Sequence, residues 1–164
     1  MNNFIIITKH LKISIIALTF LLIIIPTITA GKGIDKYIDF SPNGYEDLER
    51  IVTRNGTVLE STLPDNTEHL KITFLKSSDI YEVHIIYFNN PFTLLNFWYT
   101  FVNDYSNGLT AAFSAIPFLY GEFNIEYMKM QLSAWYKGFQ NMFFVVYGPK
   151  RSVVNDLILQ LNRW

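Results

Sequence analysis

Two neighbouring stretches in the middle of the chain place the strongest constraint on its fold. Residues 70–74 read LKITF and residues 81–85 read YEVHI, so apolar and polar side chains alternate in both. This period of two is typical of half-buried β-strands, and folding at Ser77-Ser78 brings one apolar and one polar face into register. The predicted pairs are Leu70–Ile85, Ile72–Val83 and Phe74–Tyr81 on the apolar face, and Thr73–Glu82 and Lys71–His84 on the solvated polar face.

The remaining elements predict an α+β fold. Asn90-Pro91 has the residues of a helix start, and the apolar spacing that follows predicts an amphipathic helix over 91–106, lying across the apolar face of the hairpin. Further strands are expected at 111–120, 123–128, 131–137 and 142–147, with a bend at Pro117, a turn at Gly121-Glu122 and a central position for the last strand. Gly148-Pro149 precedes a closing helix. The sequence therefore predicts an antiparallel sheet with two amphipathic helices on one face.

The N-terminal segment predicts export across a membrane. Lys9 and Lys12 precede an uncharged run from Ile13 to Gly31, and Pro26 and Ala30 follow its most apolar part. This pattern is that of a signal peptide cleaved after Ala30. The run has 19 residues, which is also long enough to span about 30 Å of hydrocarbon as an uncleaved signal-anchor helix. Both alternatives leave the rest of the chain outside the membrane.

The domain organisation follows from this division. We expect a leader or transmembrane helix over 1–30, a juxtamembrane linker over 31–44 and one extracytoplasmic domain over 45–164. The linker residues Tyr37, Ile38 and Phe40 are a potential first contact with the domain. Beyond residue 30 there are 14 acidic residues against 11 Lys and Arg. The domain therefore lacks the excess of positive charge that is typical of nucleic-acid-binding proteins. The chain has no cysteine, so the domain depends on its core rather than on disulfides.

One turn carries two interpretations. Asn55-Gly56 lies between the β-branched runs 51–53 and 57–59, and this pair favours a tight hairpin that joins them. Asn55-Gly56-Thr57 also matches the acceptor pattern for N-glycosylation, and the turn alone already explains the Asn and Gly. The preceding residues 45–52 are compatible with a short helix or an extended segment.

No catalytic constellation is evident in the sequence. His84 and Glu82 share the polar face of the hairpin and are the candidates for an acid–base pair, although polar alternation alone also places them there. Glu122 and Glu126 would lie about 13 Å apart along a strand, which is too far to share one cation. We therefore expect no catalytic residue, metal site or cofactor.

Two binding sites remain as candidates. Trp135, Tyr136, Tyr127 and Tyr120 could line an aromatic groove for a small ligand or a glycan, and they could equally be packing residues. Lys150 and Arg151 stand at the start of the closing helix, where backbone amides and cations attract anions.

These observations lead to one preferred function and two alternatives. The preferred one is a non-enzymatic domain, tethered to the membrane or secreted, that binds a protein or an envelope component. The first alternative is a small-ligand or glycan-binding module that uses the Tyr/Trp-rich surface. The second is a hydrolase-like enzyme around His84 and Glu82.

Overall fold

The computed structural model of the chain describes residues 33–106, 110 and 114–164. The chain divides into two units, Met1–Gly31 and Lys32–Trp164, and the second contains all the described residues. The apolar run expected to form the leader or anchor lies outside the described residues. Within them, no helix has both the length and the apolar character needed to cross a membrane.

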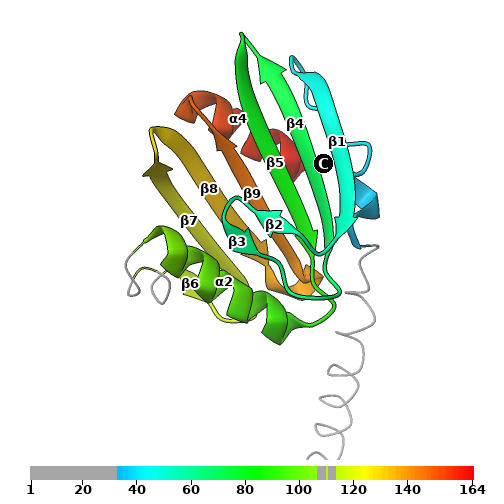
Figure 1. Cartoon of the computed structure of the whole chain (residues 1–164), viewed down its shortest axis with the longest axis vertical. Coiled ribbons are helices and arrows are strands. Elements are labelled where there is room, and N and C mark those ends of the chain that lie inside the picture. Colours follow the sequence, from blue (N-terminus) through cyan, green and yellow to red (C-terminus); the bar gives the residue numbers. More distant parts are fainter. Residues whose placement is uncertain (1–32, 107–109, 111–113) are drawn as a thin grey trace, which may run out of the picture. The chain divides into compact units, whose positions relative to one another are not determined.

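The second unit is built on a seven-stranded antiparallel sheet (Figure 1). Its elements are η1 (Gly33–Tyr37), β1 (Glu46–Arg54), β2 (Thr57–Val58), β3 (Ser61–Thr62), β4 (Glu68–Lys76), β5 (Asp79–Tyr87), α2 (Pro91–Tyr105), β6 (Ala115–Ile116), β7 (Tyr120–Tyr127), β8 (Met130–Lys137), η2 (Gly138–Gln140), β9 (Met142–Gly148) and α4 (Arg151–Arg163). The strand order is β1-β4-β5-β9-β8-β7-β6, and β2 and β3 form a separate small ribbon. The predicted α+β class is confirmed, as is the central position of β9.

The hairpin of β4 and β5 has the register that the alternation predicts. Every expected pair is present, including Phe74 with Tyr81 and Lys71 with His84. Ser77 and Ser78 have φ values of 50° and 70°, so both turn residues adopt the left-handed conformation that a tight hairpin requires. The polar face differs from the expectation, because His69 and His84 on it are buried.

The two helices lie on opposite faces of the sheet, so the prediction of both on one face is wrong (Figure 1). The central strands are apolar on both sides. On β9, Phe143 packs with α2, whereas its neighbour Phe144 packs with α4 and η1. Two covered faces require an apolar residue at nearly every position of a central strand, and the run MFFVVY in β9 supplies them.

Helix α2 begins as predicted but covers a different surface. The side chain of Asn90 accepts a hydrogen bond from the backbone N–H of Phe92 at 2.8 Å, and Pro91 occupies the first turn. Trp98 and Phe101 of α2 are fully buried against the face that carries Phe143. The apolar face of the β4–β5 hairpin, which α2 was expected to cover, instead packs against α4 and η1.

Residues 33–40 of the linker predicted over 31–44 belong to the folded unit, and the expected contact of Tyr37 and Phe40 with the domain is present. Ile34, Tyr37 and Phe40 are buried in the same cluster as α4. The Tyr37 ring packs edge-on against Phe144, with centroids 5.6 Å apart. Three apolar side chains in this short stretch are enough to dock it on the sheet.

The turn at Asn55-Gly56 forms, but the hairpin predicted around it does not. Both residues have positive φ, 67° and 113°. However, β1 pairs with β4, and β2 pairs with β3. Val58 in β2 and Leu63, directly after β3, are buried in the α2-side cluster. Their burial there directs the chain away from β1 after the turn. Residues 46–54 are a strand, which settles the question left open for 45–52.

The β6–β7 region turns earlier than expected. The reversal falls at Pro117-Phe118, with φ of 62° at Phe118, and β7 runs straight through Gly121-Glu122. Gly121 is required inside the strand because a side chain there would meet the Tyr136 ring and Trp98. Residues 111–113 of the predicted strand lie outside the described residues.

Candidate functional site

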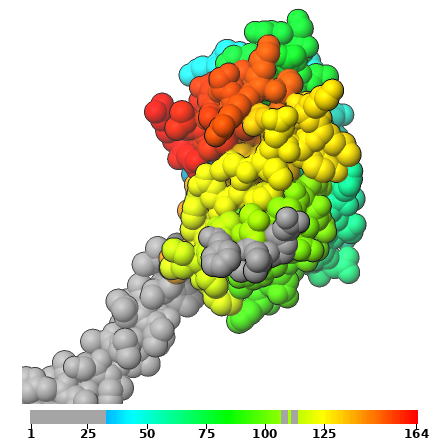
Figure 2. All heavy atoms as spheres, turned by 90° about the vertical axis from the view of Figure 1, so that its left-hand side faces the viewer, coloured from blue at the N-terminus to red at the C-terminus, as the bar shows by residue number. Residues whose placement is uncertain are grey.

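A groove of about 610 Å³ lies between α4 and the outer strands β7 and β8. In the space-filling view, the orange atoms of α4 lie next to the yellow atoms of these strands (Figure 2). The lining residues are Glu122, Asn124, Ile125, Glu126, Gln131, Leu132, Ser133, Arg151, Val154, Asn155, Ile158 and Leu159. The groove thus has a polar strand floor and a mixed helical wall.

The alternation of β7 creates this polar floor. Phe123 and Ile125 point to the α2-side core, whereas Glu122, Asn124 and Glu126 occupy the other face and are exposed. Helix α4 buries Val154, Leu157 and Leu161 together with residues of β8, β9 and the β4–β5 hairpin. The helix therefore leaves the polar face of β7 uncovered.

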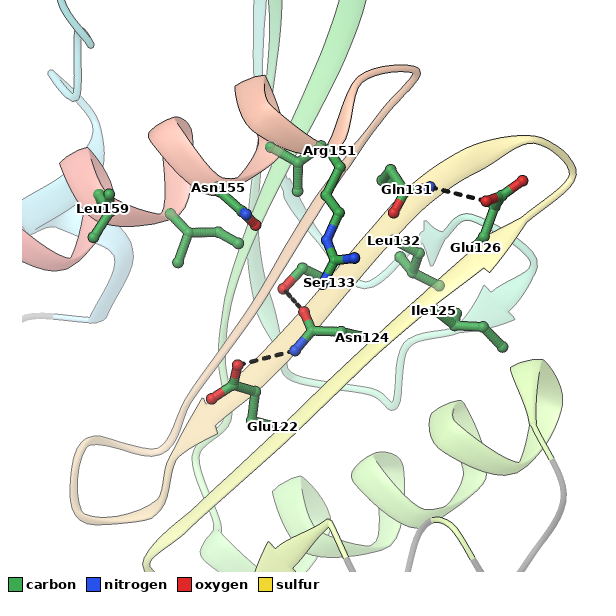
Figure 3. Close-up of a pocket in the computed structure, with 12 residues that line it drawn as sticks. Glu122, Asn124, Ile125, Glu126, Gln131, Leu132, Ser133, Arg151, Asn155 and Leu159 are labelled. Carbon is green, nitrogen blue, oxygen red and sulfur yellow. Dashed lines mark hydrogen bonds between the residues drawn. The ribbon is translucent and has the colours of Figure 1, made fainter.

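A chain of hydrogen bonds fixes the floor side chains, and Figure 3 shows the part of it that joins Glu122, Asn124 and Ser133. The Tyr120 hydroxyl donates to Glu122 Oε2 at 2.6 Å, and Asn124 Nδ2 donates to Glu122 Oε1 at 2.9 Å. Ser133 Oγ donates to Asn124 Oδ1 at 2.5 Å. The hydrogen bonds from Tyr120 and Asn124 lower the pKa of the Glu122 carboxyl, so this group is ionised at neutral pH.

Arg151 brings the positive charge of the groove. It is the first residue of α4, and its side chain extends from the helix over β8 toward Ser133 and Asn124 (Figure 3). Asn155, one turn further along, also lines the groove. The lining therefore combines two carboxylates, one guanidinium, amides and a hydroxyl.

The two cations predicted as an anion site have different surroundings in the structure. Lys150 Nζ forms an ion pair with Asp79 Oδ2 at 2.7 Å, at the turn between β4 and β5. Arg151 lines the groove, and Lys150 does not. Lys150 therefore provides a matched control for experiments on Arg151.

The four aromatic candidates do not line one groove. Trp135 and Tyr136 are almost completely buried on opposite faces of β8, Trp135 stacked on Phe144 at 5.0 Å. Tyr127 lies on the α2 side of β7. Tyr120 alone adjoins the groove, through its hydrogen bond to Glu122.

Asn55 is engaged by its own loop. Its Oδ1 accepts a hydrogen bond from the backbone N–H of Asn66 at 2.9 Å, and its Nδ2 lies 3.5 Å from Asp65 Oδ1. Both contacts stabilise the turn. Glycosylation at Asn55 stays a prediction.

His84 and Glu82 belong to a polar network on the α2 side of the sheet, in which His69 and His84 are buried and Glu82 and Lys71 are partly exposed. His69 Nε2 lies 3.0 Å from His84 Nδ1, and the two rings stack with centroids 5.2 Å apart. His84 Nε2 lies 3.4 Å from Glu82 Oε2, and Lys71 Nζ lies 2.7 Å from Glu82 Oε1. Burial, together with the nearby His84 and Lys71, lowers the pKa of His69 to about 4.

The side chains of this network line neither the groove nor a second cavity in the described part of the chain. The second, of about 170 Å³, is lined by Arg54, Asn66, Thr67, Glu68 and Asn89. His84 is 3% exposed, and contact with His84 and Lys71 lowers the pKa of Glu82 to about 2. The arrangement resembles a charge-compensated structural cluster more than a site with substrate access.

The position of several residues in the groove was not predicted from the sequence. Glu122 and Glu126 were considered only as metal ligands, and no group of three metal-binding side chains occurs in the described part of the chain. The sequence analysis assigned Asn124, Ser133 and Asn155 to no site. The signal that could have found Glu122, Asn124 and Glu126 as one polar face is the alternation E-x-N-x-E in 122–126, opposite an apolar face.

No protein-family model, no curated protein and no solved structure matches this chain.

Proposed function

We propose that this chain is a non-enzymatic binding module outside the membrane, and that the groove between α4 and β7–β8 holds a saccharide of the cell envelope. The observation that carries the proposal is the hydrogen-bonded polar floor of the groove, formed by Glu122, Asn124 and Ser133. A volume of about 610 Å³ lies within the usual range of small-ligand sites, roughly 300–1,000 Å³.

The side chains of the groove favour a polyhydroxylated ligand. Carboxylates and amide oxygens accept hydrogen bonds from sugar hydroxyls, and Arg151 and the amide groups donate to them. Ile158 and Leu159 on α4 provide aliphatic surface for the C–H faces of a sugar ring. Two carboxylates against one guanidinium disfavour a strongly anionic ligand, so a neutral or amino sugar fits best.

The residue pattern of the leader supports the proposed compartment. A basic flank, an uncharged run of 19 residues and a small residue at Ala30 support export, with the domain either anchored or released. The absence of cysteine is compatible with an oxidising environment, because no thiol is present to cross-link.

Replacing Arg151 by alanine is expected to weaken glycan binding by at least about tenfold, because a charge-assisted hydrogen bond contributes about 1.5–3 kcal/mol. The probes are oligosaccharides released from the native envelope, screened on an array and titrated by calorimetry. Lys150→Ala removes the neighbouring cation without touching the groove and should leave the affinity within twofold.

Two results would contradict the groove assignment. One is that no envelope oligosaccharide binds to the intact protein. The other is that Arg151→Ala and Lys150→Ala change the affinity equally. Thermal melting of both variants shows whether either has lost its fold.

A further inference from the structure

Five exposed apolar side chains gather at one end of the domain, and we call them the apolar end patch. They are Phe92 (63% exposed), Ile116 (61%), Phe118 (42%), Leu119 (43%) and Phe139 (57%). Single exposed apolar residues are common on soluble proteins, but a contiguous group of this kind marks an interaction surface.

The contacts that follow show that the segments carrying these side chains lie next to one another. The rings of Phe92 and Phe118 meet edge-to-face, with centroids 5.1 Å apart. The backbone N–H of Leu119 donates to the carbonyl of Ile116 at 3.0 Å. The amide of Gly138, which precedes Phe139, donates to the carbonyl of Leu119 at 2.8 Å.

The folded unit begins at the same end of the sheet. Gly33 lies against the side chains of Glu68 and Tyr87, at the start of β4 and the end of β5. The strand pairs Tyr87–Met142, Met142–Lys137 and Lys137–Tyr120 continue this end across the sheet to the start of β7. Phe118 and Leu119 of the patch immediately precede Tyr120, the first residue of β7, so the patch lies at this end of the sheet.

Almost no chain separates this end from the predicted membrane segment. The uncharged run ends at Gly31, and η1 begins at Gly33, so Lys32 is the one residue between them. One extended residue spans about 3.6 Å at most. An anchored chain would therefore hold the start of the domain close to the bilayer surface.

We propose that the apolar end patch rests in the interfacial layer of the lipid bilayer. Three phenylalanines and two aliphatic side chains match this zone, where aromatic and aliphatic groups bury apolar surface. The anchored N-terminus lowers the entropic cost of this contact, because the domain is already confined to the surface. The inference rests on the anchored form of the N-terminal run in the proposed function, but not on the groove.

The experiment uses the full-length chain, which has no cysteine and so accepts a single fluorescent label. Phe139→Cys places the label in the patch, and Ser78→Cys places it at the β4–β5 turn, at the opposite end of these strands. Each labelled protein is reconstituted in phosphatidylcholine vesicles that contain a lipid-borne spin quencher. We expect the label at position 139 to be quenched at least about threefold more than the label at 78.

A second set of variants tests whether the quenching comes from contact between the patch and the lipid or only from the anchor holding the domain near the bilayer. Ile116→Ser with Leu119→Ser should reduce the quenching at position 139 toward the level at 78. Leu48→Ser removes a similarly exposed apolar side chain from β1, outside both the patch and the groove, and should leave the quenching at position 139 unchanged. Equal quenching at 139 and 78, or quenching at 139 that survives the double serine variant, would overturn the inference. Circular dichroism confirms that each variant is folded.

Discussion

Replacing Trp98 by alanine is expected to lower the free energy of unfolding by about 3–5 kcal/mol. Trp98 has no exposed surface and lies at the centre of the α2-side core. Its ring packs edge-on against Tyr136 at 5.0 Å and against Phe143 at 6.1 Å. Alanine would leave a cavity that the surrounding rings can fill only by leaving their rotamers.

Urea denaturation measures this effect, and Phe92→Ala is its matched control. Phe92 lies on the same helix but is largely exposed, so its loss should cost less than about 1 kcal/mol. Comparable losses for the two variants would show that α2 does not cover the sheet with its Trp98 face.

The stability of the domain is expected to fall by about 3 kcal/mol as the pH is lowered from 6.5 to 4. Burial lowers the pKa of His69 from its usual 6.5 to about 4 in the folded domain. Between these values the unfolded chain binds more protons than the folded one, so acid favours unfolding. The stability is complete above about pH 6.5 and decreases as His69 is forced to accept a proton against His84 and Lys71.

His69→Gln separates this effect from that of Glu82. The variant removes the titrating ring while leaving an amide that can hydrogen-bond His84, so the loss between pH 6.5 and 4 should largely disappear. A further loss below about pH 4.5 should persist, because the pKa of Glu82 in the folded domain is also lowered, to about 2. Urea denaturation series at several pH values test this, and an unchanged slope above pH 4.5 in His69→Gln would contradict it.

Local signals in the sequence predicted local structure well. The alternation in 70–85 gave the full β4–β5 register, because a slip of one residue would exchange the two faces. Asn90-Pro91 located the start of α2, since a cap and a proline act through neighbouring backbone groups. These arguments need only residues close in sequence.

Long-range packing was not accessible in the same way. The alternation of β4 shows which residues share a face, but not which helix covers it, so α2 was placed on the wrong side. The Asn55-Gly56 turn was found, whereas its partner strands were not, because β1 pairs with β4 instead. His84 looked solvated because nothing in the sequence shows that its face is covered.

The candidate site was predictable only in part. Arg151 was predicted, together with Lys150, to bind an anion from its place at a helix start, and the structure places it in the lining of the groove. The ion pair of Lys150 was not predicted, because its partner Asp79 is distant in sequence. Trp135 and Tyr136 are neighbours on one strand and therefore point to opposite faces. The groove itself arises where α4 stops short of β7, which depends on the sheet order.

The most direct test of the account is the side of the membrane on which the domain resides. Ser78→Cys gives the cysteine-free chain one exposed thiol at the β4–β5 turn. The account predicts that a membrane-impermeant maleimide added to intact native cells labels this thiol, on the cells or in their medium, while a cytosolic cysteine protein stays unlabelled. Labelling of the chain only after the cells are lysed would place the domain in the cytosol and contradict a binding module that faces the envelope.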